Sequence, residues 1–157
     1  MCLVIDACCI PKVFDRGNRQ HPNYAPVLEW VSNGNGRMIY GGTKYGTELR
    51  ELPRYLGVIA ELQRKGRAVV LPKARVDAIA DALKAEIADP AFNDEHLVAI
   101  VIVSRCRVVC TEDKVAIPYL KRRQFYSCHG IKKPKIYQSS RNKSLCCDKN
   151  VVGNYGH

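Results

Sequence analysis

The sequence predicts an α/β fold with a mainly parallel central sheet, and three observations support this. Short apolar runs of strand type alternate along the chain with longer segments in which apolar residues recur at helical spacing. The first run, from Cys2 to Ile5, is apolar at every position, as in a parallel strand buried on both faces. No internal repeat is visible, and alternating strands and helices in one chain favour a single α/β layer structure.

The first third of the chain predicts two strands and two helices. Residues 2–6 form a buried strand that ends in Asp6, and residues 7–14 turn into a short helix. Residues 16–24 have loop composition, and Pro26 opens a helix that stops at the Asn-Gly-Asn-Gly run after Ser32. Residues 37–40 are the second strand.

The middle of the chain predicts a long helix with a break. Gly41 and Gly42 follow the second strand, and Thr43 is suited to cap a helix over 44–65. Pro53 should kink or break that helix. Five apolar residues at helical spacing are expected in the core: Leu49, Leu52, Leu56, Ile59 and Leu62.

The rest of the chain predicts three more helices and three strands. A strand over 68–71 leads to a helix that starts at Pro72. Residues 97–103 have strand propensity, but a strand at 107–110 follows too closely for a turn, so we predict a buried helix over 94–105. A short helix to Lys121 and a strand over 135–138 complete the elements.

The length of 157 residues fits one domain, which we place at 1–141 with a loosely patterned tail at 142–157. No apolar run is long enough to cross a membrane, and the first residues lack a charged secretory leader. We therefore expect a cytoplasmic protein with no membrane partner. Its eight cysteines should stay reduced, most of them as small buried residues, because there is no C-x2-C zinc pair.

The charge pattern favours an anionic partner. The net charge is +10, and the segment from Lys121 to Lys149 holds nine Lys or Arg and one acid. Aromatic residues are interleaved with these cations, which suits stacked bases of single-stranded nucleic acid. Candidate phosphate contacts are Lys44, Arg122 and Arg123.

Four acids occupy positions that meet at one end of such a sheet. Asp6 and Asp113 follow strands, Asp94 opens the helix before a strand, and Glu48 lies early in the first long helix. The carboxyl ends of parallel strands are where ligands bind. Clustered carboxylates repel one another unless a cation is present, and oxygen ligands select Mg2+ or Mn2+.

These acids and their surroundings resemble the PIN-domain ribonucleases over roughly residues 2–121. The matching pieces are Leu3 to Asp6, Glu48, Asn93 to Ala99, and Val108 to Asp113. The resemblance implies a three-layer α/β/α sandwich and endonucleolytic cleavage of RNA. Asp6, Glu48, Asp94 and Asp113 would hold Mg2+ or Mn2+, with Thr111 supporting them, and Glu95 is the alternative to Asp94. Many members are toxins with an antitoxin partner, and many are homodimers.

Two other functions stay open at this point. A catalytically idle PIN-like module would bind single-stranded or structured RNA without cutting it. A structural or redox protein would use the eight cysteines in zinc sites or disulfides. The sequence departs from the family at Cys8-Cys9, where Asn or Ser and a small apolar residue are common.

Overall fold

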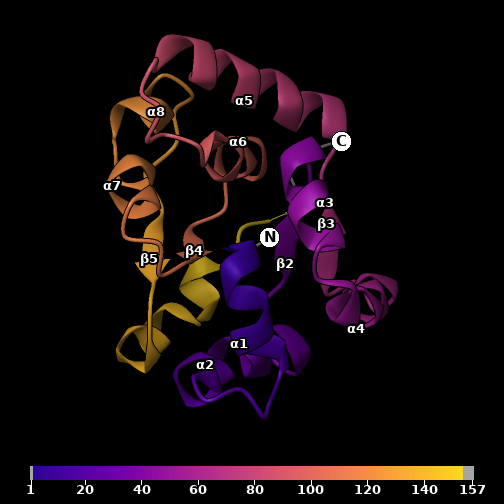
Figure 1. Cartoon of the computed structure of the whole chain (residues 1–157). Coiled ribbons are helices and arrows are strands. Elements are labelled where there is room, and N and C mark those ends of the chain that lie inside the picture. Colours follow the sequence, from indigo (N-terminus) through magenta and orange to yellow (C-terminus); the bar gives the residue numbers. More distant parts are fainter. Residues whose placement is uncertain (1, 154–157) are drawn as a thin grey trace.

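The computed structural model describes residues 2–153 and has a five-stranded, all-parallel sheet in the order β3-β2-β1-β4-β5 (Figure 1). This confirms the predicted fold class. Each strand has three residues, and Leu3 of the central strand lies opposite Met38 on one side and Val108 on the other. The strands are β1 Leu3–Ile5, β2 Met38–Tyr40, β3 Ala68–Val70, β4 Val108–Cys110 and β5 Lys135–Tyr137.

Helices cover both faces of the sheet, which makes three layers (Figure 1). Helices α5 and α6 lie on one face, with α6 against β1 and β2, and α1 and α2 lie on the other. The helices are α1 Ile10–Phe14, α2 His21–Ser32, α3 Thr43–Arg50, α4 Pro53–Arg64, α5 Lys73–Glu86, α6 Glu95–Ser104, α7 Ala116–Leu120 and α8 Gln124–Ser127. The 3-10 helices are η1 Ala7–Cys9, η2 Ser140–Leu145 and η3 Asp148–Asn150.

Helix α6 confirms the prediction of a buried helix over 94–105. All ten of its residues are buried, because α5 packs on its outer side and the sheet lies beneath it. The Ser104 hydroxyl donates a hydrogen bond to the Ile100 carbonyl at 2.6 Å. The helix ends at Arg105 in the left-handed conformation, with φ of 58°. A short connection then leads directly into β4.

Helix α2 begins earlier than the predicted start at Pro26. It runs from His21, with Pro22 in its first turn and Pro26 inside it. The predicted loop over 16–24 is correct for residues 16–20, but residues 21–24 are helical. Tyr24 in this part is fully buried, and its hydroxyl donates to the Gln138 carbonyl at 2.9 Å. That contact joins residues far apart in the sequence, and local composition does not contain it.

The predicted break at Pro53 is confirmed, and it separates α3 from α4. Thr43 does not cap α3: it is the first helical residue, and its N–H and hydroxyl donate to the Asp77 carboxylate at 2.7 and 2.6 Å. Asp77 thus provides the cap, and the Thr43 hydrogen bonds lower its pKa. Leu56 is exposed rather than in the core, because the break shifts the buried face of α4 to Tyr55.

The tail predicted to be loosely patterned contains η3 and most of η2, and η2 packs against α2 and β5. The Asn35 amide also donates to the Asp148 carboxylate at 3.0 Å. The end of that tail, residues 154–157, lies outside the described residues. Within residues 2–153, no helix has both the length and the apolar character needed to span a bilayer.

Candidate metal centre

The strand order places a topological switch point between β1 and β4. From β1 the chain moves outward through β2 and β3, then returns to the other side of β1 with β4. Ligands of open parallel sheets bind at the carboxyl ends of the strands at such a point. Asp6 follows β1, and Thr111 and Asp113 follow β4, so these side chains leave the sheet side by side.

A hydrogen-bonded chain ties these three residues together. The Thr111 hydroxyl donates to Asp6 Oδ2 at 2.7 Å and accepts from the Asp113 N–H at 3.1 Å. Thr111 is fully buried and Asp6 is 6% exposed. A hydrogen bond to a buried carboxylate fixes its orientation and offsets part of its desolvation. Asp113 Oδ1 accepts from the N–H of Val115 at 2.9 Å, at the start of α7.

Helix α3 supplies the next acid. Gly41 and Gly42 have φ of 158° and 87° before the helix, and the second value lies in the region that favours glycine. The buried Tyr45 hydroxyl donates to the Ile5 carbonyl at 2.6 Å, which anchors α3 beside the end of β1. Glu48, one turn further along, accepts a hydrogen bond from His96 Nε2 at 3.2 Å.

Helix α6 brings in His96 and two neighbouring acids. His96 is 2% exposed, and within the described residues its Nδ1 has no partner. Asp94 precedes the helix and lines the cleft, whereas Glu95 is buried beside it with Oε1 at 3.7 Å from Lys44 Nζ. The position of Asp94 favours it over Glu95 as the third ligand, and its role as a ligand stays a prediction.

The four predicted acids line one cleft of about 450 Å³. Its walls come from four segments: Asp6, Ala7, Cys8, Lys44, Glu48, Glu51, Leu52, Asn93, Asp94 and Asp113. Carboxylate oxygens on several walls suit a hard divalent cation. In residues 2–153, however, no three His, Cys, Asp or Glu side chains are placed to hold one ion. The chemistry of the donor set fits Mg2+ or Mn2+, while its side chains line the cleft without converging on a point.

The electrostatics of the cleft act most clearly on Asp94. Burial, followed by the neighbouring carboxylates of Asp6 and Asp113, raises the pKa of Asp94 from 3.8 to about 6, while His96 and Lys44 oppose the shift. The part of the shift that comes from the two carboxylates reflects the negative potential of the cleft. A bound cation would relieve that potential and favour the ionised form of Asp94.

Asp94→Asn is expected to stabilise the metal-free protein near neutral pH. Below the ordinary pKa of 3.8, Asp94 is protonated in both states and adds no penalty. As the pH rises, the unfolded state releases its proton first, so the penalty grows and is complete above the folded pKa of about 6. Urea unfolding in EDTA at about pH 7.5 and about pH 4 checks this. The gain should be present at the higher pH and nearly absent at the lower one; an equal gain at both would contradict it.

Cys8 is the sulfur on the wall of the cleft. Its hydrogen bond with Cys9, at 3.9 Å between the two sulfurs, and its burial raise the pKa of the Cys8 thiol above its ordinary range. A thiol in this form is a poor nucleophile and a poor metal ligand. All eight cysteines are free, and four are buried: Cys2, Cys9, Cys106 and Cys110.

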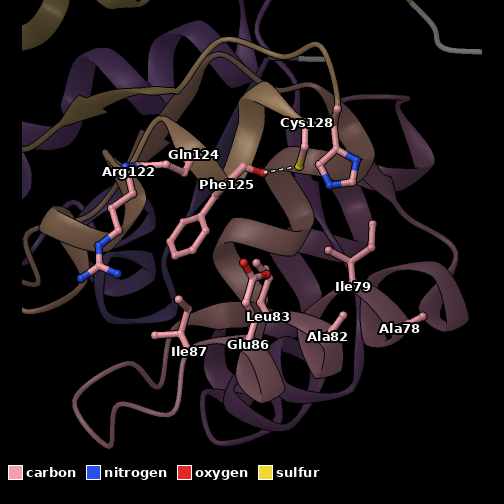
Figure 2. Close-up of a pocket in the computed structure, with 11 residues that line it drawn as sticks. Ala78, Ile79, Ala82, Leu83, Glu86, Ile87, Arg122, Gln124, Phe125 and Cys128 are labelled. Atoms are coloured by element: carbon pink, nitrogen blue, oxygen red, sulfur yellow. Dashed lines mark hydrogen bonds between the residues drawn. The ribbon is translucent and has the colours of Figure 1, made fainter.

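The three predicted phosphate contacts are separated in the structure. Lys44 lines the cleft, whereas Arg122 lies over the Tyr119 ring at 4.6 Å from its centroid and lines another cavity. That cavity, about 600 Å³ between α5 and α8, is mostly apolar, with Ile79 and Phe125 in its walls (Figure 2). Arg123 is exposed at the start of α8.

One interaction near the site has no sequence signal. Glu112 lies in sequence between two predicted site residues, Thr111 and Asp113, yet it does not line the cleft. Its carboxylate accepts from the Tyr24 hydroxyl at 2.8 Å and pairs with Lys12. Successive residues of an extended chain point to opposite sides, and this explains why Glu112 faces α1 and α2.

No protein-family model, curated protein or solved structure matches the chain. The cleft holds five carboxylates, those of the four predicted acids and of Glu51, together with one lysine and the buried Thr111 hydroxyl behind Asp6. At a switch point, such a set can hold a hard cation and an anionic substrate group together. This is the chemistry of metal-assisted hydrolysis of a phosphate ester.

Proposed function

We propose that the protein is a metal-dependent endoribonuclease of PIN type that hydrolyses RNA phosphodiester bonds. The observation that carries the proposal is the cleft at the β1/β4 switch point, lined by Asp6, Glu48, Asp94 and Asp113. Bringing four carboxylates together costs free energy because their charges repel one another. A bound cation, which the proposed function requires, would offset that cost. The basic surface of the chain supports an anionic polymer as substrate.

Those four acids would hold Mg2+ or Mn2+, which when bound supplies Lewis-acid chemistry for phosphate hydrolysis. The chain's own residues do the positioning. Thr111 orients Asp6, His96 orients Glu48, and the N–H groups at the start of α7 hold one oxygen of Asp113. Lys44 lines the cleft from α3, as Glu48 does, and is suited to bind a phosphate oxygen of the substrate.

A second function, an idle PIN-like module that binds RNA without cutting it, is favoured by one observation. Among the described residues, no three potential ligands are placed to hold one ion. Under the main proposal, cation binding draws the carboxylates inward by changes of side-chain rotamer. Under the alternative, the cleft stays open in the presence of metal.

RNA, a homodimer and an antitoxin protein belong to the same proposal, as does a cytoplasmic location. The RNA partner follows from the basic surface, and the homodimer and the antitoxin follow from the resemblance to toxin-like PIN nucleases. Co-purification with a co-expressed neighbouring gene product would test the antitoxin. Light scattering would test the dimer.

Metal removal separates the two functions. Single-stranded RNA of mixed sequence should be cut with Mn2+ or Mg2+ and left intact in EDTA, because no side chain in the cleft replaces the cation. The same cations should raise the melting temperature, since they bind only the folded state. Tight RNA binding with no products and no thermal shift would favour the idle module.

A further inference from the structure

The opposite end of the sheet holds a pocket of the opposite charge. Five cationic side chains line a cavity of about 350 Å³, which we name the amino-end pocket: Arg105, Arg107, Lys132, Lys133 and Lys135. Arg107 precedes β4 and Lys135 opens β5, so the pocket lies at the amino ends of these strands. The acidic cleft lies at their carboxyl ends, roughly 13 Å away along β4.

Four cations of the amino-end pocket, Arg107 and its three lysines, have no carboxylate partner in the part of the chain that the structure describes. None of the described side chains that line it is acidic. Within residues 2–153, no carboxylate forms an ion pair with its three lysines or with Arg107. Like charges gathered without counter-charges raise the local positive potential and attract anions.

Hydrogen bonds anchor the backbone that carries the three lysines. Gly130, with φ of 67°, turns the chain out of α8, and the Ile131 N–H donates to the Tyr126 carbonyl at 3.1 Å. Pro134 is buried, and the Lys135 N–H donates to the Arg107 carbonyl at 2.8 Å. The loop that carries Lys132 and Lys133 is thus anchored at both ends, so less order must be imposed when a ligand binds.

Arg105 adds a backbone observation that also points to a ligand. It ends α6 in the left-handed conformation, which glycine adopts at far lower cost. Among the described residues, Arg105 is the only non-glycine residue with a positive φ. A residue kept in a disfavoured conformation is a pointer to function, and here the residue lines the amino-end pocket.

We propose that the amino-end pocket binds the phosphate backbone of single-stranded RNA, as an anchoring site separate from the cleavage cleft. This rests on the proposed function in that RNA is the ligand. Several cations around one hollow match several adjacent phosphates better than one isolated anion. β5 lies at the edge of the sheet, beside β4, whose two ends lie at the two sites.

The test measures binding without cleavage. The Asp6→Asn protein in EDTA is titrated into a short fluorescent single-stranded RNA, with and without Lys132→Ala/Lys133→Ala. The double substitution is expected to weaken binding about tenfold at low salt. It should also reduce the slope of log affinity against log salt by about 1.4, which is two phosphate contacts on a single strand.

The matched control is Lys73→Ala/Lys84→Ala on exposed positions of α5, which removes the same charge elsewhere. Equal losses in both double variants would overturn the proposal, because net charge alone would then explain binding. Tripolyphosphate is the second ligand in the assay. If it binds the parent more tightly than RNA does and loses affinity in the same variant, the pocket serves a free polyphosphate and the RNA assignment fails.

A cleavage assay keeps this proposal apart from the proposed function. In the otherwise unchanged chain, Lys132→Ala/Lys133→Ala should slow the cutting of long RNA and leave the cutting of a dinucleotide unchanged. If the variant cuts neither the long RNA nor the dinucleotide, these lysines belong to the cleavage site and the anchoring role is overturned. If the parent cuts neither substrate, the nuclease proposal fails while the binding titration still decides the anchoring site.

Discussion

Asp6→Asn is expected to lower the rate of RNA cleavage at least about 100-fold at saturating Mn2+. Asp6 is 6% exposed and leaves the central strand at the switch point, where it faces the other acids of the cleft. Asparagine has the same shape and can still accept the 2.7 Å hydrogen bond from Thr111. It removes the negative charge, which is what a cation needs, so folding should be kept while metal affinity falls.

Single-turnover cleavage rates and Mn2+ titration measure this effect directly. Asp81→Asn is the matched control, because Asp81 is an exposed acid on α5 that does not line the cleft. The control should cut at the parental rate. Urea unfolding should show Asp6→Asn to be at least as stable as the parent without metal, since one repelling charge has gone. Parental cleavage by a folded Asp6→Asn protein would remove the site assignment.

Ile100→Ala is expected to lower the free energy of unfolding by about 2–5 kcal/mol. Ile100 is fully buried in the middle of α6, between α5 and the sheet. Removing three carbons there leaves a cavity that packed neighbours on both sides cannot close. For a domain of this size, the melting temperature should fall by roughly 5–15 °C.

Leu56→Ala removes the same three carbons from an exposed side chain. Leu56 is 39% exposed on α4, so its truncation should cost less than about 1 kcal/mol. Urea unfolding of both variants compares the two positions. Equal losses would mean that α6 is not packed between two layers as described.

The course of the chain through β1, β4 and α6 could be predicted because apolar pattern alone decides it. Residues 97–103 are apolar without a gap, and the strand that follows leaves space only for a helix. The start of α2 could not be predicted in this way. Tyr24 anchors it through hydrogen bonds to Glu112 and the Gln138 carbonyl, and such distant contacts override the loop composition around it.

The candidate site, too, could be predicted where local pattern decides the structure and not where contacts between distant residues do. That Asp6 and Asp113 line one cleft could be predicted, because parallel strands end on one side of the sheet. The direction of each carboxylate could not, since hydrogen bonds from Thr111 to Asp6 and from α7 to Asp113 set it. The amino-end pocket could not be predicted from the sequence either. β4, α7 and α8 separate Arg107 from the lysines that line the pocket with it.

The central place of β1 has a consequence for synthesis on the ribosome. This strand emerges first, yet its second neighbour is β4, whose register pairs Leu3 with Val108. Until residue 108 has left the exit tunnel, one edge of β1 is open and the switch point does not exist. A site built at this switch point therefore assembles only after about two thirds of the chain has been synthesised.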